Sequence, residues 1–146
     1  MKTVTALALL LLTLPLFAAD APANDDAAIR AVIEQYFKSH ATGDGQYVNS
    51  VFHPELKMMF VRDGAFVMRT RDEYVSGFNG KAPEDEAKRK RSILTIDITG
   101  NAAMAKLRLD YPRATLTDYF SLLKINGEWK VVNKIFNSEA KPSESK

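Results

Sequence analysis

The chain contains no cysteine, and this absence removes several kinds of protein at once. Without thiols there is no disulfide, no thiolate nucleophile and no lipid-modified cysteine. The sequence also lacks the G-x-S-x-G signature of hydrolases, the H-E-x-x-H signature of metalloproteases and a glycine-rich phosphate loop. Because its two histidines have no acidic residues nearby at ligand spacing, the sequence predicts no metal site, and no cofactor is expected.

The chain also lacks a strong charge of either sign. It has 20 Lys and Arg against 18 Asp and Glu over 146 residues, so its composition does not indicate a nucleic-acid partner. The densest charge run, "KRKR" at residues 88–91, follows three acidic residues and is interpreted as part of a solvated loop. Hydrophobic residues at 46% and charged residues at 26% are typical of one soluble domain.

The one long apolar run lies at the N-terminus. Lys2 precedes apolar residues 4–17, and small residues follow, which is the pattern of a secretory signal peptide over residues 1–18. A membrane span needs about 20 apolar residues, so an uncleaved anchor is the less favoured alternative. We therefore expect a periplasmic or secreted protein with no stable membrane insertion after cleavage.

Behind the signal peptide, the sequence predicts a single folded domain over residues 25–137. A flexible leader over residues 19–24 precedes it, and the polar residues 138–146 are predicted to form a disordered tail. About 120 residues are enough for one modest core.

Helical signals come first in the domain. Apolar residues at three-and-four spacing predict a helix from Asp25 to Gly43, and a shorter helix is expected before Pro54. Thr70 and Glu73 have the spacing of a capping box, which predicts a third short helix.

Strand signals follow, separated by turn dipeptides. Asp63-Gly64, Gly100-Asn101 and Asn126-Gly127 each adopt positive φ at low cost and predict three hairpins. Helices followed by antiparallel strands predict an α+β domain in which the N-terminal helices pack on a strongly curved antiparallel sheet. Such a sheet can enclose a cone-shaped pocket against the long helix.

Four segments in this order resemble the nuclear transport factor 2-like superfamily, which has a cystatin-like fold and includes the ketosteroid isomerase and SnoaL-like polyketide cyclase families. They are residues 33–44, 51–61, 93–109 and 117–136, and the most similar branch is the one described as putative lumazine-binding. The resemblance implies the cone-shaped fold. It does not imply one activity, because the superfamily includes isomerases, cyclases, dehydratases and non-enzymatic binders.

Counting outward from the Asn126-Gly127 turn gives the faces of the last hairpin. This register pairs Phe120 with Asn133 and Asp118 with Ile135, which places Asp118 and Asn133 inside with Trp129. Lys134 then lies on the opposite face. That face is apolar enough to predict a homodimer through the open sheet.

Two residues are candidate general bases. Asp118 in an apolar pocket would have a raised pKa, although a hydrogen-bonded structural carboxylate is the alternative. His53 is the second candidate, with a loop-bracing role as its alternative, and His40 at the end of the first helix has less functional weight. The predicted ligand contacts, to a small apolar or aromatic molecule, are Tyr36, Asn133, Phe120 and Trp129.

Three functions follow from these residues. The first is an exported protein that binds a small apolar molecule in the cone. The second is an isomerase or dehydratase with Asp118 or His53 as base and Tyr36 as hydrogen-bond donor to a developing enolate. The third is a non-catalytic homodimeric interaction module.

Overall fold

A computed structural model describes residues 22–142, so the predicted signal peptide over residues 1–18 lies outside the described residues. The first helix, α1 (Pro22–Thr42), begins three residues before the expected start. The end of the predicted flexible leader is therefore helical. The expected stop is confirmed, because Gly43 follows with a φ of 72°.

Two further α-helices and one 3-10 turn complete the helical part. They are α2 (Gln46–Val51), α3 (Arg71–Val75) and the turn at Glu86–Lys88. The capping box is confirmed, since the Thr70 side chain accepts from the Glu73 N–H and the Glu73 carboxylate accepts from the Thr70 N–H.

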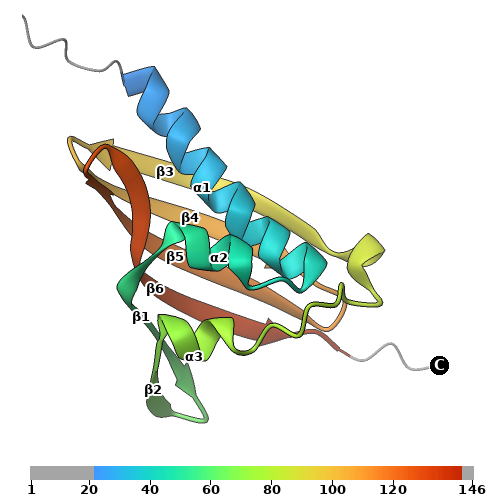
Figure 1. The fold of residues 1–146 in the computed structure, drawn as a ribbon. Coiled ribbons are helices and arrows are strands. Elements are labelled where there is room, and N and C mark those ends of the chain that lie inside the picture. Colours follow the sequence, from blue (N-terminus) through green and yellow to red (C-terminus); the bar gives the residue numbers. More distant parts are fainter. Residues whose placement is uncertain (1–21, 143–146) are drawn as a thin grey trace, which may run out of the picture.

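Six strands form one curved sheet in the order β2-β1-β6-β5-β4-β3. Figure 1 shows α1 and α2 lying across one face of the sheet, which confirms the α+β arrangement. Neighbouring strands are antiparallel except β1 and β6, which run parallel, so the sheet is mixed rather than wholly antiparallel. The strands are β1 (Phe52–Arg62), β2 (Ala65–Thr70), β3 (Lys90–Thr99), β4 (Ala102–Asp110), β5 (Ala114–Ile125) and β6 (Glu128–Ala140).

All three predicted hairpin turns are confirmed. Asp63, Gly64, Gly100, Asn126 and Gly127 have positive φ, the backbone region that these residue types tolerate best. The C-terminal boundary is different from the prediction. β6 continues to Ala140, which pairs with Ala114, so residues 138–140 belong to the sheet and not to a disordered tail.

A bulge in β6 changes the predicted register. Near the turn the pairs are as expected, with Leu122 opposite Val131. Ser121 then pairs with Asn133, which leaves Val132 as an extra residue in β6. Because strand side chains alternate between faces, the β6 residues from Asn133 onward lie on the opposite face from the one predicted.

The buried core lies between the helices and the covered face of the sheet, called here the inner face. α1 contributes Ile29, Ile33, Tyr36 and Phe37 to it. Most of the remaining buried side chains come from β1 and the last three strands: Phe52, Leu56, Met58, Phe60, Ala103, Ala105, Leu107, Leu109, Phe120, Leu122, Trp129 and Val131.

Candidate functional site

Three polar side chains meet inside this core. The hydroxyl of Tyr36 donates to Oδ2 of Asp118 at 2.5 Å, and Nζ of Lys134 donates to Oδ1 at 2.7 Å. Asp118 is 0% exposed and Lys134 is 3% exposed. An ion pair removed from water in this way needs good geometry and hydrogen bonds to offset its desolvation, and both carboxylate oxygens of Asp118 have a donor.

The β6 bulge produces this cluster. Lys134 lies opposite Phe120, and Phe136 lies opposite Asp118, so Lys134 points inward beside Asp118. The predictions that Asn133 shares a face with Asp118 and that Lys134 lies on the other face are therefore wrong. The Lys134 ammonium also lies 4.4 Å from the centre of the Phe136 ring, a distance typical of a cation–π contact.

Burial changes the proton affinity of Tyr36 and Lys134. It raises the pKa of Tyr36 well above its ordinary value, and the neighbouring Asp118 charge acts in the same direction. Burial lowers the pKa of Lys134, while the charge and hydrogen bond of Asp118 oppose this shift. The Tyr36 hydroxyl thus stays protonated and available as a donor at neutral pH.

A second polar pair continues from Tyr36 toward the surface. The ring of His40, one turn further along α1, lies 4.7 Å from the Tyr36 ring, and its Nε2 hydrogen-bonds to the Tyr74 hydroxyl at 2.8 Å. Burial lowers the pKa of His40 to about 3, assisted by the positive charges of Lys134, Arg91 and Arg89. His40 is therefore a neutral imidazole at neutral pH.

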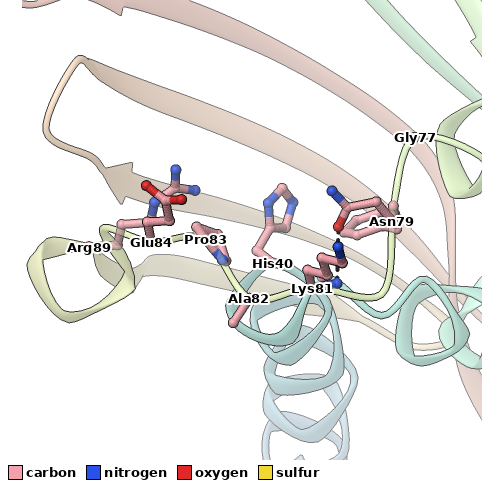
Figure 2. Close-up of a pocket in the computed structure, with 10 residues that line it drawn as sticks. His40, Gly77, Asn79, Lys81, Ala82, Pro83, Glu84 and Arg89 are labelled. Atoms are coloured by element: carbon pink, nitrogen blue, oxygen red, sulfur yellow. Dashed lines mark hydrogen bonds between the residues drawn. The ribbon is translucent and has the colours of Figure 1, made fainter.

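His40 also lines a cavity of about 460 Å³ at the end of α1. Figure 2 shows His40 between Asn79 and Lys81 on one side and Glu84 and Arg89 on the other. The apolar part of the lining comes from Gly43, Gly77, Phe78, Ala82 and Pro83. This volume is within the range typical of small-molecule sites.

Gly43 holds the cavity loop against the helix. The Gly80 N–H donates to the Gly43 carbonyl at 2.8 Å, and a Cβ on Gly43 would lie 2.0 Å from the Lys81 carbonyl oxygen. A side chain at this position would therefore push residues 79–81 away from α1. Gly43 also has the positive φ described above, so glycine satisfies two requirements here.

The other predicted contacts lie elsewhere. Asn133 is partly exposed on the outer face opposite Ser121. Phe120 is fully buried, with its ring 4.9 Å from Tyr36 and 5.9 Å from Phe52. Trp129 lies near the opposite end of α1, where its indole N–H donates to Asp25 at 2.9 Å.

The hydrogen bond of His53 is local and does not involve Asp118, Tyr36 or Lys134. His53 lies at the start of β1, and its Nδ1 accepts the Glu55 N–H at 3.2 Å. Of the six predicted site residues, the structure brings Asp118, Tyr36 and Phe120 together.

Sequence reasoning missed the inward position of Lys134 and the contact of Tyr74 with His40. The spacing of Tyr36 and His40, four residues apart on one helix, correctly indicates that both face the same side. No comparable signal marks Lys134, since the bulge that turns it inward contains no glycine. Among residues 22–142, no group of three or more histidine, aspartate or glutamate side chains could hold a metal ion.

The fold is that of the nuclear transport factor 2-like superfamily. A solved structure from Shewanella baltica OS155, a protein of unknown function with this fold, matches with a TM-score of 0.72 and 26% identity over 84% of this chain and 98% of its own. One from Silicibacter pomeroyi DSS-3, also of unknown function, has the same TM-score at 19% identity, over 82% of this chain and 99% of its own.

Within that superfamily the chain belongs to the family described as putative lumazine-binding, whose model matches residues 24–137. The resemblance found in the sequence is thereby confirmed. The chain is also similar to a protein from Cladobotryum sp. named aldolase FrzH, with 27% identity over 113 residues, which is 76% of this chain and 89% of that protein.

Proposed function

We propose that this protein binds a small molecule at the cavity beside His40, with the polar chain behind His40 contacting its polar group. The observation that carries the proposal is the adjacency of two polar groups. His40 lines the cavity and hydrogen-bonds to Tyr74, and its ring contacts that of Tyr36, which hydrogen-bonds to Asp118 beside Lys134. Ligand sites typically combine apolar walls with a few convergent polar groups. The family's description also supports a small-molecule ligand.

The lining favours an aromatic or apolar molecule that carries a hydrogen-bonding group. Phe78 meets His40 edge-on at 5.5 Å and Tyr74 edge-on at 5.5 Å, so aromatic rings form one side of the site. Tyr111 extends this group, with its ring 6.4 Å from that of His40. The polar end of the ligand would meet His40, Tyr74 and Tyr36, in place of the contacts to Asn133 and Trp129 expected from the sequence.

Native mass spectrometry of protein purified from its own source tests this proposal. We expect a retained mass of a few hundred daltons. Gly43→Val, which displaces the cavity loop, should lose that mass, while Gly64→Ala at the distant β1–β2 turn should keep it. Retention by Gly43→Val, or no retained or exchangeable small molecule with the wild-type protein, would contradict binding at this cavity.

A second candidate function is acid–base catalysis on a carbonyl compound. The name of the related aldolase supports carbonyl chemistry, and the Asp118 and Tyr36 pair supplies an acceptor and a donor in a dry environment. Asp118 would act as base and Tyr36 as donor to an enolate, whether the reaction is of the aldol, isomerase or dehydratase type. Asp118→Asn should abolish turnover of a carbonyl substrate, and His53→Gln should not.

The outer face of the sheet is proposed to form a homodimer. Val61 and Phe66 are each 70% exposed and lie opposite one another on β1 and β2. With Met59, Tyr119 and Ile135 they line an apolar groove of about 370 Å³. Such a surface is stabilised by contact with an equivalent apolar surface.

Export is proposed on the pattern of residues 1–18 alone. N-terminal sequencing of the protein from its source should begin after Ala18, and an N-terminus at Met1 or Lys2 would contradict export. Along residues 22–142, no helix is long and apolar enough to cross a membrane.

A further inference from the structure

Lys134 differs from the other lysines for which the structure describes an ion pair. Lys124, Lys130 and Lys141 pair with carboxylates at positions open to water, with side chains 23%, 29% and 36% exposed. The amine of Lys134 is enclosed by Asp118 and two aromatic rings, with the Phe136 ring centre at 4.4 Å and the Tyr36 ring centre at 5.6 Å.

We infer that Lys134 is a carbonyl-reactive lysine that forms an imine with an aldehyde or ketone ligand. This inference rests on the proposed binding function, because the ligand must first enter at His40. It adds a covalent step and names the ligand class. The three groups that the step needs, an amine, a carboxylate and a hydroxyl, are already in hydrogen-bond contact.

The reaction balances with the groups present. Asp118 accepts a proton from the Lys134 ammonium, and the neutral amine attacks the carbonyl carbon to form a carbinolamine. The carbinolamine oxygen takes a proton from the Asp118 carboxyl and leaves as water, which gives a protonated imine on Lys134. One water is released and no oxidant or reductant is required.

The charge of the site is the same before and after this reaction. The protonated imine carries the positive charge that the ammonium carried, so Asp118 keeps a cationic partner in the dry core. The Tyr36 hydroxyl, whose pKa is raised by burial and by Asp118, remains protonated and is placed to donate to the carbonyl or carbinolamine oxygen.

Burial also favours the reactive form of the amine. Desolvation lowers the pKa of Lys134, which increases its neutral fraction at neutral pH, and desolvated lysines are a known source of imine-forming nucleophiles. Asp118, Tyr36 and Phe136 face this amine directly. The Lys134 charge also acts on His40, since it is among the charges that lower the pKa of His40.

Side-chain contacts through Tyr36 connect the cavity to the Lys134 amine. His40 lines the cavity, the Tyr36 ring lies 4.7 Å behind His40, and the Lys134 amine lies 5.6 Å from the Tyr36 ring. A carbonyl group that takes the place of Asp118 as acceptor for the Tyr36 hydroxyl therefore lies next to Lys134. The ligand class that fits is a small ketone or aldehyde with an aromatic or apolar body.

The test uses pentane-2,4-dione, a diketone that forms a stable enaminone with neutral lysine amines. Peptide mass spectrometry of the native protein at neutral pH compares Lys134 with Lys130, an exposed lysine on the same strand. We expect Lys134 to be modified faster than Lys130, because desolvation increases the neutral fraction of its amine. In denaturant the two rates should become equal.

Two variants locate the reaction. Lys134→Arg should remove the fast modification, and Lys130→Arg should keep it. Modification of Lys134 no faster than Lys130 in the wild-type protein would overturn the inference, and this comparison does not depend on the folding of a variant. If a retained ligand is still seen by native mass spectrometry in that case, the covalent step fails while the proposed binding function stands.

Discussion

Each face of the sheet carries some side chains that are unusual for their surroundings. The inner face encloses an ammonium, a carboxylate and a phenol at Lys134, Asp118 and Tyr36. The outer face exposes large apolar side chains, including Val61 and Phe66 at 70% each. Each arrangement costs stability in an isolated monomer, because buried charge loses its hydration and exposed apolar surface remains in water.

The two faces are stabilised in different ways. The inner charges are paired, and both oxygens of Asp118 accept a hydrogen bond, so their cost is limited within the chain itself. The outer apolar groove has no covering element among residues 22–142 and would be stabilised only by another surface. The proposed ligand-binding role therefore involves the inner face, and the proposed association role involves the outer face.

Removing one partner of the inner ion pair should have the largest effect. Lys134→Met leaves the Asp118 carboxylate buried without its cation, which should lower the free energy of unfolding by about 3 to 5 kcal/mol. Urea unfolding measures the change. Lys130→Met on the same strand is the control and should change stability by less than about 1 kcal/mol. A similar loss in both variants would contradict the special role of the inner pair.

Placing a charge in the outer groove should have the next largest effect. Ile135→Lys puts an ammonium beside Val61 and Phe66 and should weaken self-association at least about a hundredfold, since an unpaired buried charge costs several kcal/mol. Sedimentation equilibrium measures the constant. Glu34→Gln on the exposed side of α1 makes the same change in net charge and should leave association unchanged. A wild-type monomer at high concentration would refute the predicted dimer.

Acid should lower the free energy of unfolding because of His40. Its pKa of about 3 in the fold is below the ordinary value of 6.5, so the unfolded chain takes up a proton between these values while the folded protein does not. The free energy of unfolding should therefore fall as pH decreases from 6.5 toward 3, by up to about 2 kcal/mol at pH 5.

His40→Gln tests the source of this dependence. Glutamine can hydrogen-bond to Tyr74 but does not titrate, so the slope of stability against pH above pH 4.5 should be reduced. His53→Gln, at the start of β1, is the matched control. An equal reduction in both variants, or none in His40→Gln, would show that His40 does not cause the acid sensitivity.

The substitution that tests the β6 bulge has the smallest predicted effect on stability. Because Asn133 lies on the outer face, Asn133→Ala should change stability by no more than about 0.5 kcal/mol and should leave the retained ligand in place. A loss comparable to that of Lys134→Met would favour the unbulged register, in which Asn133 is inside. Hydrogen exchange of the β6 amides would then distinguish the two registers.

The β6 bulge also limits how much of the strand register could be predicted from the sequence. The turn at Asn126-Gly127 fixed the pairs close to it, including Ile125 with Glu128. An extra residue at Val132 could not be foreseen, because no glycine marks the position of this bulge. A second register shift, between Ile93 and Thr95, leaves Leu94 47% exposed while Ile93 and Ile96 pack against the core.

Features that depend on residues close in the sequence were predicted correctly, whereas contacts between distant segments were predicted less well. The capping box at Thr70 and the stop at Gly43 depend on neighbouring residues, and both are confirmed. Asp118 and Tyr36 are 82 residues apart, and their contact depends on how α1 lies on the sheet. Asp25, expected only to suit the helix start, also binds Trp129 and so holds α1 to the last hairpin.

The most direct test of the account is the stability of the triple variant Tyr36→Phe/Asp118→Leu/Lys134→Met. If the inner polar groups are maintained for ligand chemistry, replacing all three with apolar side chains of similar size should leave the free energy of unfolding unchanged or raise it by about 1 to 4 kcal/mol. A triple variant that is several kcal/mol less stable than the wild-type protein would instead make the cluster a structural requirement and contradict its assignment as a site.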